Sequence, residues 1–138
     1  IILVGILKGS VMWMADLIKR IDLDLAIDFM AISSYGDEKQ SSGVVKIIKD
    51  IDIAIEDKDV IIVEDIVDSG TTLAYLKSYL KNMNPKSISI CTLLDKPEGR
   101  KTLVDIDYKG FEVEDVFIVG YGLDYAQKYR NLPYIKEL

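Results

Sequence analysis

Short apolar runs separated by polar turns recur along the chain, and their spacing predicts alternating strands and helices. Residues 1–7 form a continuous apolar run, which is typical of a strand buried on both faces. Apolar side chains at intervals of three and four, beginning at Met14, predict a helix over about 11–21 with Ser10 as its cap.

The rest of the chain continues this alternation. A second helix is expected over 72–83, ended by Asn84-Pro85, and a polar turn is expected over 65–71. Further strands are expected at 25–33, 43–48, 60–63, 87–94 and 117–119, the second of them as a hairpin partner of the first. The pattern predicts one domain over residues 1–138, an open, mainly parallel twisted α/β sheet with helices on both faces. In such sheets ligands collect beyond the carboxyl ends of the strands.

Composition restricts the chemistry that this domain can perform. The 138 residues include no histidine and one cysteine, Cys91, which lies in an apolar run and is expected to be a buried thiol. Catalysis by Ser-His-Asp or Cys-His groups and zinc bound by histidine are therefore excluded. Acid–base chemistry must come from carboxylates, lysine, tyrosine or the backbone.

Charge and hydropathy narrow the choice of partners. Lys plus Arg is 17 and Asp plus Glu is 23, so the net charge is −6, which argues against a nucleic-acid partner. No apolar stretch approaches the ~18 residues of a membrane span, so we expect a cytoplasmic protein without a membrane partner. The chain starts at Ile1 within an apolar run, and we expect that an N-terminal piece precedes it.

The strongest chemical signal is the segment 60–72. A buried strand ends in the adjacent carboxylates of Glu64 and Asp65, and the turn that follows presents Asp68 and hydroxyl side chains at a helix start. Free N–H groups, the helix dipole and Gly70 would together form a cradle for a monophosphate. The alternative is a simple strand–turn–helix with Ser or Thr as cap, although the doubled acid favours a cation or sugar hydroxyls nearby.

Other phosphate-binding motifs are absent. No G-x-G-x-x-G opens a helix, and the run Gly99-Arg100-Lys101-Thr102 lacks the spacing of a G-x-x-x-x-G-K-[ST] loop. A nucleotide triphosphatase or a dinucleotide dehydrogenase is therefore not expected.

The segment 64–72 resembles the phosphoribosyl-pyrophosphate (PRPP) motif of type I phosphoribosyltransferases. The other landmarks are similar to the bacterial hypoxanthine-guanine branch and follow its order along the whole chain. They are Leu7-Lys8-Gly9-Ser10, Ser34-Tyr35, Leu93-Leu94-Asp95-Lys96-Pro97, and Phe117-Ile118-Val119-Gly120-Tyr121-Gly122-Leu123-Asp124-Tyr125 running on to Arg130. The resemblance implies the type I phosphoribosyltransferase fold with a small hood from about 95–138, here shortened.

The resemblance also implies roles for individual residues in binding PRPP. Glu64 and Asp65 would face the ribose hydroxyls directly or through Mg²⁺, and Asp68 would be the general base near purine N7. A cis peptide would precede Lys8. The residues implied in binding PRPP and its phosphates are Lys8, Gly9, Glu64, Asp65, Asp68, Ser69, Gly70, Thr71, Thr72 and Arg130.

For the base, the resemblance implies that Phe117 stacks on the purine, Lys96 donates to its O6 and the Ile118 carbonyl accepts from its edge. Asp124 would lie near the 2-position and would help to hold a second Mg²⁺ near the pyrophosphate, separate from the one at Glu64 and Asp65. Ser34 and Tyr35 would open a lid over the site. Each of these residues also has an ordinary alternative: Phe117 in the core, Lys96 and Arg130 in solvent, Asp68 as a cap or turn residue, Asp124 as a cap or in solvent, and 35–42 as a surface hairpin, which its composition allows equally well.

The implied reaction transfers 5-phosphoribosyl from PRPP to N9 of hypoxanthine or guanine, giving IMP or GMP and releasing pyrophosphate, with Mg²⁺ as cofactor. Relatives associate, so a homodimer or homotetramer is expected. Two alternatives stay open: a PRPP-sensing regulator that binds nucleic acid, and the same transfer to xanthine or adenine.

Overall fold

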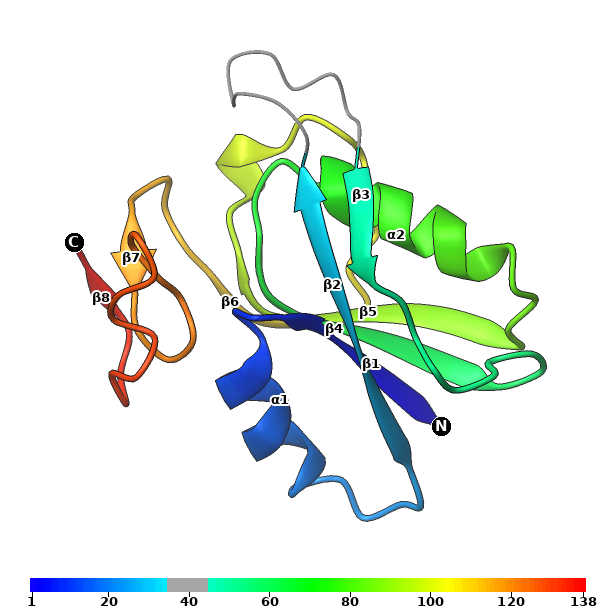
Figure 1. Ribbon diagram of the computed structural model, residues 1–138. Coiled ribbons are helices and arrows are strands. Elements are labelled where there is room, and N and C mark those ends of the chain that lie inside the picture. The colour runs from blue at the N-terminus through cyan, green and yellow to red at the C-terminus, as the bar shows by residue number, and fades with distance from the viewer. Residues whose placement is uncertain (35–44) are drawn as a thin grey trace.

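A six-stranded, mostly parallel sheet forms the centre of the computed structural model, which describes residues 1–34 and 45–138. Its strand order is β3-β2-β1-β4-β5-β6, with β3 alone antiparallel to its neighbour (Figure 1). The strands of this sheet are β1 (Ile2–Leu7), β2 (Ala26–Ser34), β3 (Val45–Lys49), β4 (Asp59–Val67), β5 (Ser87–Asp95) and β6 (Tyr108–Glu112). The predicted fold class is confirmed.

The other elements surround this sheet. The helices are α1 (Val11–Ile18) and α2 (Thr71–Lys81), with a 3₁₀ turn η2 at Pro97–Gly99. The last strands, β7 (Ile118–Val119) and β8 (Lys136–Glu137), pair antiparallel as a separate two-stranded sheet beside the end of the main one (Figure 1). In the part of the chain that the structure describes, no helix is long and apolar enough to cross a membrane.

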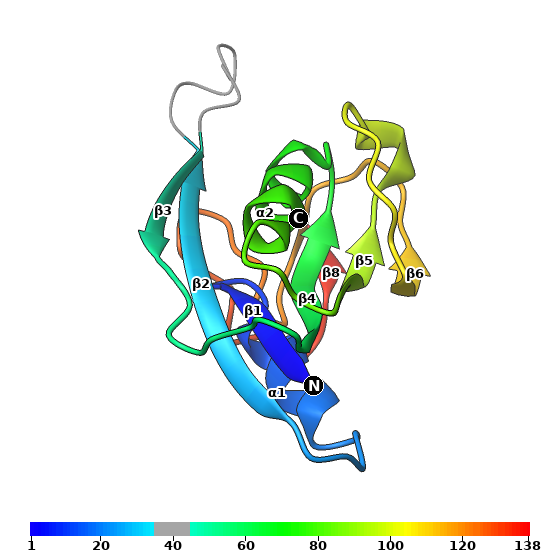
Figure 2. The ribbon, with the colours of Figure 1, turned by 90° about the vertical axis from the view of Figure 1, so that its right-hand side faces the viewer.

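The two helices cover opposite faces of the sheet, which explains the continuous apolar run of β1. Successive strand residues point to opposite faces. Val4 therefore packs in the same core as Leu76 of α2, whereas Leu3 packs with Met14 of α1 (Figure 2). A strand with both faces covered has no position that favours a polar side chain, as the sequence predicts.

Several predicted boundaries move. The first helix stops at Ile18 instead of continuing to 21, and the second spans Thr71–Lys81 instead of 72–83. Ser10 is not a side-chain cap: it is buried, and its hydroxyl donates to the Ile6 carbonyl at 2.7 Å. A buried hydroxyl needs a partner, and the nearby strand carbonyl provides one.

The strand with the acid pair is longer than its apolar run. The residues assigned to a polar turn over 65–71 are partly in β4, which continues to Val67 and pairs there with Asp95 of β5. Strand β6 was not predicted because all five of its residues are exposed, so its sequence shows no apolar period. The hairpin of β2 and β3 is confirmed, with Ser34 opposite Val45.

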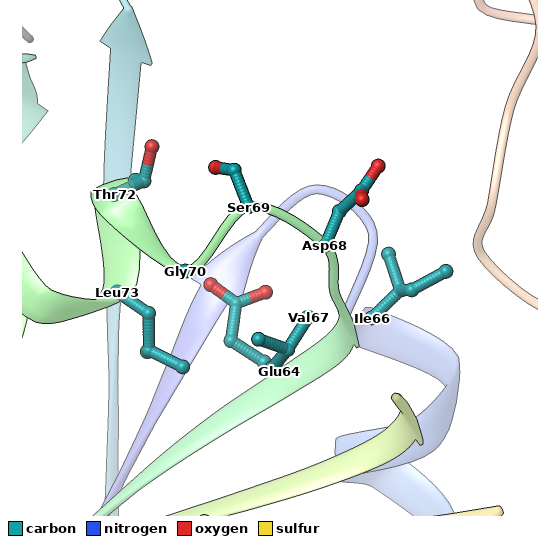
Figure 3. Close-up of a pocket in the computed structure, with 8 residues that line it drawn as sticks. All are labelled: Glu64, Ile66, Val67, Asp68, Ser69, Gly70, Thr72 and Leu73. Carbon is teal, nitrogen blue, oxygen red and sulfur yellow. The ribbon is translucent and has the colours of Figure 1, made fainter. Parts of the chain in front are cut away.

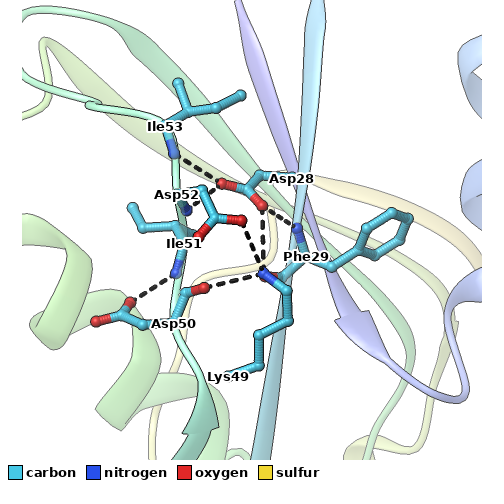
Figure 4. Close-up of polar contacts among 7 residues, drawn as sticks. All are labelled: Asp28, Phe29, Lys49, Asp50, Ile51, Asp52 and Ile53. Carbon is cyan, nitrogen blue, oxygen red and sulfur yellow. Dashed lines mark hydrogen bonds and ion pairs between the residues drawn. The ribbon is translucent and has the colours of Figure 1, made fainter.

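A buried carboxylate, Asp28 of β2, secures the connection between β3 and β4 (Figure 4). It accepts hydrogen bonds from the backbone N–H groups of Phe29, Asp52 and Ile53 at 2.7, 2.7 and 3.0 Å, and Lys49 lies 3.6 Å away. Burial acts to raise the pKa of Asp28, but the backbone donors and Lys49 outweigh it and hold the pKa below its ordinary value.

The contacts of Asp28 predict a pH-dependent contribution to stability. Asp28→Asn is expected to lower the free energy of unfolding by about 1–3 kcal/mol at pH 7, because the amide bonds fewer of the donors. Since the folded-state pKa is lowered, the advantage of the wild type is complete above about pH 4 and is lost as pH falls through the lowered pKa. Urea unfolding of both proteins at several pH values measures it. A pH-independent difference would contradict the assignment, and Asp22→Asn, an exposed change, serves as control.

Candidate active site

Glu64, Ile66 and Val67 of β4 form one wall of a pocket of about 240 Å³. Glu64 points into this pocket beneath the turn that follows the strand (Figure 3). Asp65 lies against the turn after β1: a side-chain carbon at Gly9 would fall 1.9 Å from its Oδ2. Glycine at position 9 is therefore what lets this backbone approach the carboxylate.

The two carboxylates are costly to bury. Burial raises the pKa of Glu64 well above its ordinary value, and the neighbouring charge of Asp65 adds to the effect. Burial also raises the pKa of Asp65, although the positive charge of Arg130 acts in the opposite direction. The two ionised carboxylates would be stabilised by a bound cation or by hydroxyl donors.

The other wall is the turn 68–70 and the first residues of α2. Gly70 adopts φ +79°, a left-handed conformation that suits glycine, and the Ser69 hydroxyl accepts a hydrogen bond from the Thr71 N–H at 3.3 Å. Asp68, Ser69 and Thr72 project their oxygens around the pocket (Figure 3). A helix N-terminus with surrounding hydroxyls can bind an anionic group such as a phosphate.

The loop after β5 holds this turn in place. Lys101 and Thr102 donate backbone hydrogen bonds to the Ser69 carbonyl at 2.8 and 3.0 Å, and the Arg100 guanidinium donates to the Asp68 carbonyl at 3.2 Å. A side-chain carbon at Gly99 would fall 1.8 Å from Asp68 Oδ1. The sequence showed Gly99-Arg100 only as a failed nucleotide motif, because it contains no sign that this loop folds over the turn.

Arg100 is itself anchored at the end of β5. Its guanidinium bonds to the buried Asp95 carboxylate, which also pairs with Lys109 at 3.4 Å. Through Asp95, the ion pair with Lys109 of β6 is linked to Arg100. Arg100 in turn donates to the Asp68 carbonyl and so helps to keep Asp68 at the rim of the pocket.

Basic residues from the two ends of the chain meet beside the acid pair. The Leu7–Lys8 peptide is cis, as the resemblance implied. A side-chain carbon at Gly122 would fall 2.2 Å from the Gly9 carbonyl oxygen, so the backbone at Gly122 packs directly on the Lys8–Gly9 turn. Arg130 donates to the Gly122 carbonyl at 2.6 Å and pairs with Asp124 at 3.3 Å.

The sequence did not identify Gln127, which joins the two cations. Its side-chain oxygen accepts from Lys8 Nζ at 3.2 Å and from Arg130 Nη2 at 3.3 Å. A polar residue in a turn carries no sequence signal for such a role, because the contact spans most of the chain.

The residues implied in binding a base lie near the end of β5. Lys96 is only 8% exposed, and its ammonium group has no hydrogen-bond or ion-pair partner among residues 1–34 and 45–138. Phe117 is 52% exposed and meets Tyr125 edge-on at 5.6 Å between ring centroids, so it is outside the core. Ile118 packs on Leu93 and Leu94, which places β7 beside this strand end.

Two further expectations concern the lid over the site and the metal site. Ser34 is the last residue of β2, whereas Tyr35 and the expected lid lie outside the described residues. Within the described ranges, no three acidic or cysteine side chains gather as a preformed metal site.

Comparison with known proteins finds relatives that are similar to this chain in both sequence and fold. Residues 1–126 match the family model of the phosphoribosyl transferase domain. The hypoxanthine-guanine phosphoribosyltransferase of Bacillus subtilis is 59% identical over 132 residues, which are 96% of this chain and 73% of that protein.

Solved structures agree. A hypoxanthine phosphoribosyltransferase from Staphylococcus aureus superimposes with a TM-score of 0.96 at 54% identity, over 99% of this chain and 74% of that one. A hypoxanthine-guanine phosphoribosyltransferase from Bacillus anthracis gives 0.95 at 51% identity, over 99% and 81%.

The burial of Glu64 predicts a stability cost in the ligand-free protein. Glu64→Gln is expected to raise the free energy of unfolding by about 0.5–2 kcal/mol at neutral pH, because it removes a desolvated charge next to Asp65. Chemical denaturation without ligand measures the change. Glu56→Gln, an exposed substitution of the same kind, should change little, and a destabilised Glu64→Gln protein would contradict the prediction.

Proposed function

The chain belongs to the phosphoribosyltransferase family, and from this premise we propose which of its residues carry the reaction. The enzyme is of the hypoxanthine-guanine type: it transfers 5-phosphoribosyl from PRPP to N9 of hypoxanthine or guanine and releases pyrophosphate. The observation that supports this most directly is the acid pair of β4, whose Glu64 lines a pocket of about 240 Å³ at the start of α2.

We propose that the donor lies across the carboxyl end of the sheet. The turn from Asp68 to Thr72 binds the 5′-phosphate through the N–H groups and hydroxyls at the start of α2. Glu64 and Asp65 face the ribose hydroxyls. Lys8, Gly9 and Arg130 bind the pyrophosphate arm, for which the convergence of both cations on one point is the support.

Mg²⁺ fits the acidic residues of this site. Magnesium in proteins is commonly held by one or two carboxylates plus substrate phosphates, and the raised pKa values of Glu64 and Asp65 indicate carboxylates that a cation would stabilise. We propose that Glu64 and Asp65 hold one Mg²⁺ at the ribose in the presence of donor, and that Asp124 helps to hold a second one near the pyrophosphate. Bound there, Mg²⁺ would neutralise charge on the departing pyrophosphate.

The base is proposed to bind between Lys96 and Phe117. The Lys96 side chain is largely buried, and its ammonium group, which has no partner among the described residues, would donate to O6; this favours a 6-oxopurine over adenine. The exposed ring of Phe117 would stack on the purine, and the Ile118 carbonyl would accept from its edge. Asp124 would lie near the 2-position.

The chemistry then requires little covalent participation by the protein. As pyrophosphate departs, positive charge develops on the ribose anomeric carbon, and purine N9 attacks that carbon. Asp68, placed at the pocket rim by Gly99, accepts the proton from N7 of the base. Binding both substrates in alignment provides the remaining acceleration.

A cytoplasmic location and assembly into a homodimer or homotetramer also belong to this proposal.

Asp68→Asn tests the general base. The amide cannot accept the proton, so kcat is expected to fall about 100-fold or more, whereas the KM for PRPP stays within about twofold. Steady-state kinetics with guanine and PRPP measure both. Asp115→Asn, an exposed aspartate on the approach to β7, is the matched control, and an unchanged kcat for Asp68→Asn would refute the role.

Lys96→Met tests recognition of the base. Loss of the O6 donor is expected to lower kcat/KM for hypoxanthine and guanine by about 10–200-fold, while PRPP binding is retained. Initial rates with hypoxanthine, guanine, xanthine and adenine measure the selectivity of wild type and variant. Lys101→Met, an exposed lysine on the same loop, is the control, and equal losses for all four bases would contradict a specific contact with O6.

A further inference from the structure

The side chain of Gln127 lies between two cationic side chains, those of Lys8 and Arg130. Its oxygen makes the contacts that an anion would make there. Its Oε1 accepts from Lys8 Nζ at 3.2 Å and from Arg130 Nη2 at 3.3 Å. Both partners can only donate, so the oxygen and not the amide NH₂ must face them. A single neutral oxygen thus serves two positively charged groups that come from opposite ends of the chain.

The turn around Gln127 is built to present this side chain. Its backbone N–H donates to Asp124 Oδ2 at 2.8 Å, and Tyr125 and Lys128 close the turn with hydrogen bonds of 3.1 and 2.9 Å. Ala126 and Gln127 adopt φ +50° and +66°, which residues other than glycine rarely do. The exposed Gln127 therefore takes its position from the turn and its two cations and not from burial.

The two cations are not saturated by these contacts. Arg130 Nε is buried and has no partner among residues 1–34 and 45–138, although the guanidinium also bonds to the Gly122 carbonyl and to Asp124. Apart from Gln127, no described group is hydrogen-bonded to the ammonium of Lys8. An anion with several oxygens would satisfy both groups better than one neutral amide oxygen, because it adds the attraction of opposite charges and offers a separate acceptor to each donor.

We infer that the Gln127 amide oxygen is an internal stand-in for a pyrophosphate oxygen: it holds Lys8 and Arg130 together in the free enzyme and is displaced when pyrophosphate or the pyrophosphate arm of PRPP binds. Gln127 is thus a positioning residue that competes with the anion and lowers its affinity. The competition favours release of the product. This role rests on the proposed function, since it takes pyrophosphate as the anion at these cations.

Removal of the competing oxygen should tighten binding. Gln127→Met keeps the length of the side chain without the acceptor, and it is expected to lower the Kd of pyrophosphate about 3- to 10-fold, the value of one or two modest hydrogen bonds. Gln127→Glu should raise the Kd by a similar factor, because a carboxylate holds the cations more strongly. Titration calorimetry with pyrophosphate, with and without Mg²⁺, measures both, and Asn131→Ala removes an exposed neighbouring amide as the control.

Kinetics give a second readout. In the reverse reaction, from IMP and pyrophosphate, Gln127→Met should lower the KM for pyrophosphate while the KM for IMP stays unchanged. Gln127→Ala, a shorter variant, should behave in the same way. Unchanged or weaker pyrophosphate binding by both variants, in a wild type that binds pyrophosphate and turns over, overturns the stand-in role alone. A wild type that neither binds pyrophosphate nor transfers phosphoribosyl overturns the proposed function as well.

Discussion

The site depends on the close packing of three segments around Gly9: the Lys8–Gly9 turn, the end of β4 at Asp65, and the backbone at Gly122. A side-chain carbon there would meet Asp65, and one at Gly122 would meet the Gly9 carbonyl oxygen. The Lys8–Gly9 turn is thus held between the acidic end of β4 and the segment that carries Asp124 and Arg130. Because neither position has room for a methyl group, acidic and basic groups that are distant in sequence share one small volume.

This stacking also explains the electrostatic character of the site. Desolvation raises the pKa of Glu64 and of Asp65, while Arg130 partly offsets it at Asp65. Lys8 and Arg130 in turn share the neutral oxygen of Gln127, and Arg130 also pairs with Asp124 and the Gly122 carbonyl. The carboxylate pair, the Lys8 ammonium and the Arg130 Nε are therefore incompletely satisfied within the described part of the free protein. A ligand that combines hydroxyls, phosphates and a divalent cation would satisfy the carboxylates and the cations at once. The free protein is less stable because of these charges, and ligand binding offsets that loss.

Some residues that touch no proposed substrate group still position the residues that do. Arg100 and Asp95 touch no proposed substrate group, yet they hold the loop whose Gly99 leaves space for Asp68. Asp28 plays a comparable part at the other end of the sheet, where it secures the connection into β4. In both places a carboxylate replaces packing as the means of fixing a loop.

Much of the fold was readable from the sequence because β1, β4 and β5 are covered on both faces, and a run such as Ile1–Leu7 has no other stable place. The acid pair, the turn 68–72 and the landmark motifs could likewise be located, because each is a local pattern that imposes its own chemistry. Strand β6 escaped notice since an exposed edge strand needs no apolar period. Gln127, Gly122 and Gly99 escaped for a different reason: their roles exist only in contacts between distant segments, and only the tertiary structure brings those segments within reach of one another.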